Sequence, residues 1–294
     1  MYSKILIVGG TGMLGRPVVW KFIRDGYSVR VMTHSPERAK NFFGDSVETV
    51  TGDVTDPASL SNPMNGCDAV YINLGAKMDI NKLDAIERQG TANVAEAAGD
   101  KGIKRIGMIS GLNVGEADLK VPFYRAKAAA EKALMESGIS YTIFRCCWFY
   151  ESLPLYVQGK KAVMLGNQPH PVSWIAAADY AAMVSKAYST AEAENKIFHV
   201  RGIEKRTIPD ALVEFCNIVV PDAKLSPIPL WLASVASFFS RKGKMKGLIQ
   251  FMRYFDRHPE TEVQDDTEKI LGPALTTLKD WAQEYKRQLL AGKG

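Results

Sequence analysis

A strand-like run that enters a glycine-rich turn is the feature that most constrains how this chain folds. Residues 4–8 read Lys-Ile-Leu-Ile-Val, and the sequence continues Gly-Gly-Thr-Gly-Met-Leu-Gly before an apolar helical pattern begins. Glycines at this spacing admit a phosphate to a helix N-terminus, where unpaired N–H groups and a partial positive charge attract anions. The order of strand, turn and helix predicts a dinucleotide-binding site. The alternative is a glycine-rich turn that binds no ligand.

The glycine turn supplies the predicted pyrophosphate contacts. Gly9 permits the tight turn, Gly12 permits close approach of the phosphate, and Gly15 lets the helix pack against the strand. The other residues of the turn assigned to the cofactor are Thr11, Met13 and Leu14.

The first half of the chain alternates strand and helix patterns, which predicts an α/β fold with a Rossmann-type, doubly wound parallel sheet. Strands are expected at 4–8, 28–32, 47–51, 68–74, 105–110 and 140–146, and helices near 13–25, 36–43, 56–62, 81–100 and 122–137. After about residue 150 the rhythm changes, and the pattern becomes mainly helical from 228 onwards. We therefore expect a dinucleotide-binding core at 1–150 and a smaller, mainly helical substrate-binding subdomain at 151–294. The second part is expected to close over the nucleotide and not to form an independent domain.

The end of the second strand bears on which nicotinamide cofactor binds. A carboxylate there would bind the ribose 2′-hydroxyl of NAD, but the sequence offers Thr33, His34 and Arg38 instead. These side chains suit a 2′-phosphate, so NADP is favoured over NAD. The alternative for Arg38 is a solvated helix face.

Two further strand ends complete the predicted cofactor site. Asp53, after the third strand, can accept a hydrogen bond from the adenine amino group, and the backbone of Val54 can read the ring edge. Asn73, Leu74 and Gly75 end the fourth strand, where small residues let the backbone lie along the cofactor.

Three residues are candidates for chemistry at the nicotinamide. Ser110 ends the fifth strand, where a hydroxyl can face the nicotinamide, and Lys127 follows on a helix. The ammonium group of Lys127 can bind ribose hydroxyls and lower the pKa of a neighbouring hydroxyl. Tyr124 is the third candidate, and the alternative for Lys127 is a surface helix lysine.

Taken together, these residues resemble the short-chain dehydrogenase/reductase superfamily. The resemblance to the superfamily rests on the glycine turn, Gly52-Asp53, Asn73-Leu74-Gly75, Ser110, Lys127 and Glu131. The run Tyr141-Thr142-Ile143-Phe144-Arg145 is similar to the atypical, NmrA-like branch of that superfamily. The resemblance implies a reductase that binds NAD(P)H. It also implies a Tyr four residues before the Lys, where this chain has Phe123. Tyr124 lies about 60° from Lys127 around the helix axis, against about 40° for position 123.

The resemblance leaves three functions open. The first is an NADP-dependent oxidoreductase that acts on a small carbonyl, quinone or aromatic substrate. Some NmrA-like reductases of aromatic substrates lack the Tyr, so its absence does not exclude an enzyme. The second is a non-catalytic redox sensor, because other members of the branch bind nucleotide without turnover. The third is a membrane-surface accessory subunit that holds nucleotide structurally.

Composition limits the partners of this chain. Its net charge of +5 is too small to argue for nucleic acid, and its four cysteines have neither metal-ligand nor disulfide spacing, so we expect no metal site and a cytoplasmic location. The segment 228–257 combines apolar residues with a basic cluster. It is either a peripheral membrane or protein docking element, or a helical substrate lid with a solvated basic turn.

Overall fold

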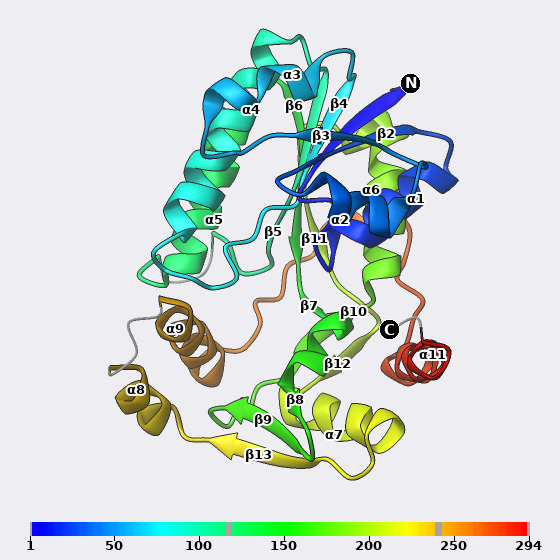
Figure 1. Ribbon diagram of the computed structural model, residues 1–294. Coiled ribbons are helices and arrows are strands. Elements are labelled where there is room, and N and C mark those ends of the chain that lie inside the picture. The colour runs from blue at the N-terminus through cyan, green and yellow to red at the C-terminus, as the bar shows by residue number, and fades with distance from the viewer. Residues whose placement is uncertain (1, 116–118, 239–242, 293–294) are drawn as a thin grey trace.

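A seven-stranded parallel sheet forms the centre of the computed structural model, which describes residues 2–115, 119–238 and 243–292 (Figure 1). The strand order is β11-β6-β5-β4-β1-β2-β3. The strands are β1 (Lys4–Val8), β2 (Ser28–Thr33), β3 (Glu48–Thr51), β4 (Ala69–Ile72), β5 (Arg105–Gly111), β6 (Ser140–Cys146) and β11 (Lys196–Val200). The predicted Rossmann-type α/β fold is thereby confirmed.

Helices cover both faces of this sheet, which explains why its central strands are apolar along their whole length. Figure 1 shows α3 (Ser61–Met64), α4 (Gly90–Asp100) and α5 (Pro122–Met135) on one face, and α1 (Gly15–Arg24), α2 (Pro36–Phe43) and α6 (Ala177–Tyr188) on the other. Every residue of β4 is buried, and so is each residue of β1 after Lys4. Each face therefore has its own hydrophobic core.

Two of the expected helices differ from the prediction. The helix expected over 81–100 begins with a π-helical segment, η2 (Asp84–Gln89), before α4. The helix expected over 56–62 is a 3₁₀ turn, η1 (Pro57–Ser59), followed by α3, and Pro63 lacks the N–H that a continuous helix would pair with Ser59. Asp56 caps η1 by accepting a hydrogen bond from the Ala58 N–H.

The segment after β6 builds the lower part of the molecule in Figure 1. It contains two three-stranded sheets, β12-β10-β7 and β13-β9-β8. The strands are β7 (Trp148–Phe149), β8 (Val157–Gln158), β9 (Lys161–Leu165), β10 (Val172–Ile175), β12 (Glu204–Arg206) and β13 (Lys224–Ile228). The helical elements are η3 (Tyr150–Tyr156), η4 (Ala191–Ala193), α7 (Ile208–Val219), α8 (Leu230–Phe238), α9 (Gly243–Arg257), α10 (Thr267–Leu271) and α11 (Leu278–Leu290).

This later segment also returns to the central sheet. β11 pairs in parallel with β6, and α6 packs against α1. The hydroxyl groups of Tyr180 on α6 and Tyr71 on β4 lie 2.5 Å apart in the buried core. The rest of the later segment lies over the carboxyl edge of the sheet, which is where ligands bind in folds of this topology.

Candidate functional site

The glycine turn has the geometry that the sequence predicts. Gly9 has a φ of +82°, and a Cβ on it would lie 2.3 Å from the carbonyl oxygen of Asn73. A Cβ on Gly15 would lie 2.3 Å from the carbonyl oxygen of Gly9. A Cβ on Gly12 would meet only the Gly9 oxygen, at 3.2 Å. Gly9 and Gly15 are therefore needed for packing, whereas Gly12 leaves a space that a ligand can fill.

The N-terminus of α1 adjoins this space and offers N–H groups that can bind an anion. Its first turn contains no acidic residue, and no side chain caps its N–H groups. Such a helix end favours an anion. The turn and the helix together fit a pyrophosphate.

Cationic side chains lie close to the turn at the end of β2. The guanidinium groups of Arg16 and Arg38 both lie over the ring of Phe42, at 4.6 Å and 5.6 Å from its centroid. His34 and Arg38 are exposed, while Thr33 is buried and its hydroxyl accepts a hydrogen bond from the Ser35 N–H. The positive charge at this edge suits a phosphate group.

The loop after β3 is held in place by its own side chains. Asp53 accepts hydrogen bonds from the N–H and the hydroxyl of Thr55, and these bonds hold the pKa of its carboxyl group below the usual value. The buried Val54 has a carbonyl oxygen that accepts a hydrogen bond from Asn93, 2.8 Å away. The loop is thus fixed at the outer end of the predicted cofactor site.

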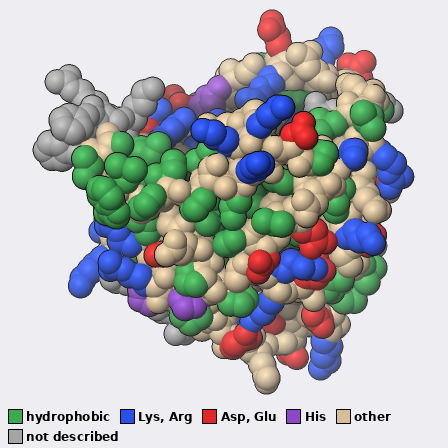
Figure 2. All heavy atoms as spheres, turned by 90° about the horizontal axis from the view of Figure 1, so that it is seen from below, with side chains coloured by type: hydrophobic (Ala, Val, Ile, Leu, Met, Phe, Trp, Pro, Cys, Tyr) green, Lys and Arg blue, Asp and Glu red, His purple; other side chains and the backbone are tan. Residues whose placement is uncertain are grey.

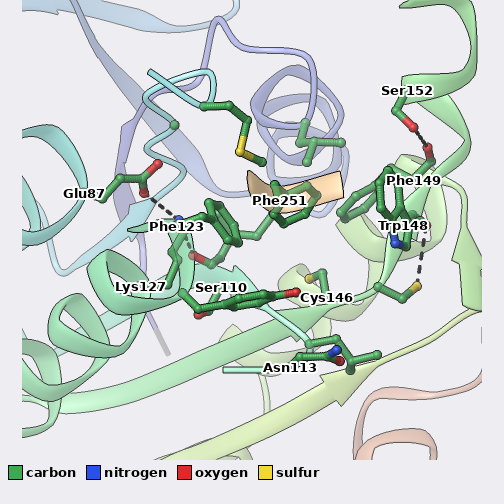
Figure 3. A pocket seen from close by; sticks show the side chains of 18 of the residues that line it. Glu87, Ser110, Asn113, Phe123, Lys127, Cys146, Trp148, Phe149, Ser152 and Phe251 are labelled. Atoms are coloured by element: carbon green, nitrogen blue, oxygen red, sulfur yellow. Dashed lines mark hydrogen bonds and ion pairs between the residues drawn. The ribbon is translucent and has the colours of Figure 1, made fainter. Parts of the chain in front are cut away.

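A pocket of about 460 Å³ opens at the carboxyl edge of the sheet (Figure 3). It brings together nine of the residues predicted from the sequence, namely Gly12, Met13, Leu14, Asn73, Leu74, Gly75, Ser110, Tyr124 and Lys127. The remaining predicted residues, which are Gly9, Thr11, Gly15, Thr33, His34, Arg38, Asp53 and Val54, do not line it. Its far wall is aromatic and consists of Phe123, Trp148, Phe149, Phe251 and Phe255.

Lys127 is a buried residue of this pocket and not a surface lysine. Its ammonium nitrogen lies 2.7 Å from the carboxylate of Glu87 and donates to the carbonyl oxygens of Ile109, at 3.1 Å, and Leu74, at 3.4 Å. Glu87 also accepts a hydrogen bond from the Ala76 N–H. All three N–H bonds of the ammonium group therefore have protein partners, and a ribose hydroxyl would replace the longest of these contacts.

Glu87 is the site residue that sequence reasoning missed. It lies in the π-helical segment η2, and Figure 3 shows its carboxylate turned toward Lys127. Single-turn π-helices are frequent at functional sites. The only sequence signal was an acidic residue within a helical pattern, which is ordinarily solvated.

The hydroxyl of Ser110 donates to a second buried carboxylate. Its oxygen lies 2.5 Å from Oε1 of Glu131, and Glu131 is paired with Arg145 at 2.7 Å. The Ser110 proton is therefore directed away from the pocket. The lone pairs of its oxygen are the part of this group that a ligand can use.

Tyr124 lines the pocket beside Phe123. Its ring packs against Phe123, Phe251 and Tyr254, and burial raises the pKa of its hydroxyl well above the usual value. The hydroxyl therefore stays protonated and keeps a proton that it can donate in a hydrogen bond. The two thiols of the pocket, Cys146 and Cys147, also have pKa values raised by burial, so they are poor nucleophiles.

The two helices of the segment 228–257 differ in their relation to the pocket, so the substrate-lid and docking interpretations apply to different parts of it. α9 is part of the pocket, because the ring of Phe251 lies 5.1 Å from that of Phe123 and 5.7 Å from that of Trp148. α8 is not among the lining elements. Residues 239–242, which carry part of the basic cluster, lie outside the described residues.

Comparisons with known proteins agree with this geometry. A family profile described as NAD(P)H-binding matches residues 9–190. The chain is 28% identical over 302 residues to the photosystem II assembly factor Ycf39 of Trieres chinensis, covering 98% of this chain and 94% of that protein. It is also 28% identical over 203 residues to an NAD(P)H azoreductase of Xenophilus azovorans, covering 67% of this chain and 68% of that protein.

A solved structure shares the fold over nearly the whole length. The NADPH-dependent quinone oxidoreductase QOR2 of Escherichia coli, complexed with NADPH, superposes with a TM-score of 0.73 and 20% identity. The match covers 96% of this chain and 99% of that one.

Proposed function

Because this chain belongs to the NAD(P)H-binding family whose profile matches residues 9–190, we propose that it is an NADPH-dependent reductase of quinones or similarly flat aromatic acceptors. The expected relationship to the atypical, NmrA-like short-chain dehydrogenases/reductases is confirmed, and so is a nicotinamide cofactor. Preference for NADPH over NADH is part of the proposal and is supported by the cationic edge at Arg16 and Arg38.

The observation that carries the proposal is the continuity of the pocket. It begins at Gly12 and Asn73, passes Lys127 and Ser110, and ends at an aromatic wall. The glycine turn, Asn73 and Lys127 would hold NADPH, which would supply the hydride. A flat aromatic acceptor fits the remaining space, because aromatic side chains stack on such molecules.

The proton supply of the site favours a quinone over a ketone or aldehyde. A ketone or aldehyde takes up hydride to give an alkoxide, which is about as basic as hydroxide and so needs an acid that protonates it. A quinone gives a phenolate-type oxygen with a conjugate acid near pKa 10, as for tyrosine, which water can protonate afterwards. Among the described residues, position 123 is Phe, the Ser110 proton is directed to Glu131, and the Lys127 ammonium group is held by Glu87 and two carbonyl oxygens. Tyr124 can donate a hydrogen bond to the developing oxyanion.

NADPH oxidation measured with matched acceptors tests the proposal. We expect turnover with 1,4-naphthoquinone and none with benzaldehyde or cyclohexanone. Phe251→Ala should raise the KM for the quinone several-fold without changing the Kd for NADPH. Leu155→Ala, at an exposed position outside the pocket, should change neither. Turnover of benzaldehyde at the rate of the quinone would contradict the proposed substrate class.

Specific observations favour a second function, in which the protein holds nucleotide without turnover. The ammonium group of Lys127 is fully bonded and Phe123 has no hydroxyl. A relative that matches over nearly the whole chain is named an assembly factor. NADPH binding at micromolar Kd without oxidation by any quinone would favour this role. A redox sensor would in addition bind NADPH and NADP⁺ with different affinities.

The small-molecule partner and the cytoplasmic location belong to the same proposal. All four cysteines are free in the structure, which suits a reducing compartment. Cell fractionation tests the location.

A further inference from the structure

Helix α8 (Leu230–Phe238) is oriented opposite to what the hydrophobic effect favours. Trp231, Leu232 and Val235 are 68%, 46% and 54% exposed, whereas Ala233 and Ser237 are each 7% exposed. A helix on the surface of a soluble domain normally turns its large apolar residues inward. In α8 it is Ala233 and Ser237 that face the protein, together with the partly buried Leu230.

This orientation is fixed by hydrogen bonds. The Ser234 hydroxyl donates to the Leu230 carbonyl oxygen, at 2.6 Å, and accepts a hydrogen bond from Arg253 of α9, at 2.8 Å. The Ser237 hydroxyl donates to the Ser234 carbonyl oxygen, at 2.8 Å. Turning α8 about its axis would break the contact between Arg253 and Ser234, whereas the two bonds within α8 would turn with the helix. The outward face of Trp231, Leu232 and Val235 is therefore built into the fold.

Positive charge lies next in sequence to this apolar face. In the first turn of α9, Lys244 and Lys246 are exposed on either side of Met245, which is itself 42% exposed. The single acidic residue of α9, Asp256, is directed elsewhere and accepts hydrogen bonds from the Asn167 and Gln168 N–H groups. Figure 2 shows hydrophobic side chains gathered at the end of the molecule where α8 lies in Figure 1.

We propose that α8 and the first turn of α9 form a docking surface for an anionic lipid bilayer. Tryptophan suits the interface of a bilayer because it has an apolar body and a polar N–H. Lysines beside an inserted apolar face add attraction to anionic headgroups. In the described part of α8 and the first turn of α9, the exposed charged side chains are Lys244 and Lys246, and this positive charge favours a layer of anionic lipid headgroups. Among the described residues no helix is long and apolar enough to cross a bilayer, so the contact is peripheral.

Co-sedimentation of the full-length protein with vesicles tests this proposal. We expect binding to vesicles of phosphatidylcholine with about one third phosphatidylglycerol, and little binding to phosphatidylcholine alone. Raising the salt concentration from 50 mM to 500 mM should weaken the binding strongly, because the charges are exposed. The double variant Trp231→Ser/Val235→Ser should lower the partition coefficient by about tenfold or more. Lys244→Glu/Lys246→Glu should abolish the preference for anionic vesicles.

The matched control replaces two exposed apolar residues outside α8 and α9 with serine. Leu155 and Leu275 are 71% and 74% exposed, and Leu155→Ser/Leu275→Ser should bind vesicles as the wild type does. Equal NADPH affinity and equal far-UV circular dichroism will show that each variant is folded. No binding to anionic vesicles at 50 mM salt would overturn the proposal. Self-association that disappears in Trp231→Ser/Val235→Ser, without vesicle binding, would instead assign the surface to a protein interface.

Discussion

At the scale of single residues, the three glycines of the turn have two tasks: Gly9 and Gly15 are needed for packing, and Gly12 leaves space for a ligand. Gly15 has no room for a methyl group, because a Cβ would lie 2.3 Å from a backbone oxygen. A Cβ on Gly12 would lie 3.2 Å from the Gly9 oxygen, a tight contact that a small shift relieves, and Gly12 lines the pocket on the side of the predicted phosphate. We expect Gly12→Ala to leave the Tm within a few degrees of wild type and to weaken NADPH binding by about tenfold or more, since it fills the ligand's space. Gly15→Ala should lower the Tm itself.

Thermal unfolding and fluorescence titration with NADPH separate these outcomes. If Gly12→Ala bound NADPH as tightly as the wild type, the pyrophosphate would not lie at this turn.

The pair of Glu87 and Lys127 is the most consequential polar contact in the pocket. Both side chains are almost fully buried, and their charged atoms lie 2.7 Å apart. Removing one partner of such a pair leaves an uncompensated charge and costs about 3–5 kcal/mol. We expect Glu87→Gln and Lys127→Met each to lower the free energy of unfolding by this order. The double variant should lose less than the sum, because it buries no unpaired charge.

Urea unfolding of the four proteins measures this coupling, and strictly additive losses would contradict a paired role. The Lys127→Met variant also tests the role of the ammonium group in quinone reduction. Lys127→Met should reduce quinone turnover much more than NADPH affinity if the ammonium group acts at the nicotinamide.

At the scale of elements, the sequence predicts those helices and strands whose signals lie in neighbouring residues. The strand, turn and helix over 4–24 have their signals in adjacent residues, and the helix expected over 36–43 matches the observed α2. The π-helical start of the helix over 81–100 has no such signal, and its Glu87 pairs with Lys127, which lies on another helix. The aromatic wall likewise joins Phe123 of α5 to Phe251 of α9. Sequence spacing cannot reveal such contacts between distant segments.

A single carboxylate ties two central strands at their N-terminal ends. Asp68, before β4, accepts hydrogen bonds from the N–H and hydroxyl of Ser3 and from the N–H of Lys4 in β1. These bonds lower the pKa of Asp68 from 3.8 to about 2. Because the folded-state pKa lies below the unfolded one, this stabilisation is present above about pH 4 and disappears as the pH falls through about 2.

Asp68→Asn should therefore lower the free energy of unfolding by about 1–2 kcal/mol at pH 7. The difference from wild type should shrink steadily below pH 4. Asp222→Asn serves as control, because that carboxylate lies on the surface, 3.9 Å from Lys160, and should change stability little at any pH. A difference for Asp68→Asn that stayed constant between pH 7 and pH 2 would show that charge is not its cause. Urea unfolding of the wild type and both variants between pH 7 and pH 2 measures these differences in the free energy of unfolding.

At the scale of the whole molecule, the sequence pattern changes at about residue 150, but elements from both sides of this position pack together in one core. β11 adds to the central sheet beside β6, and α6 covers one face of it. The buried core on that face contains residues from both sides of the boundary, including Phe144 and Phe198, whose rings lie 6.3 Å apart. We therefore propose that 151–294 is a subdomain that cannot be detached from the core.

A fragment of residues 1–150 should consequently fail to fold. It would expose the edge of β6 and the apolar face that α6 covers, and an unpaired edge of this kind promotes aggregation. We expect no cooperative thermal transition and no NADPH binding by the fragment, even though it contains every residue predicted to bind the cofactor. The full chain should unfold in one transition, which saturating NADPH shifts upward as a whole, by about 2.7 kcal/mol at a hundredfold excess over Kd. A soluble fragment with a sharp transition and wild-type NADPH affinity would show instead that the glycine turn and its sheet are sufficient. In that case the packing of β11 and α6 would serve the substrate side of the pocket alone.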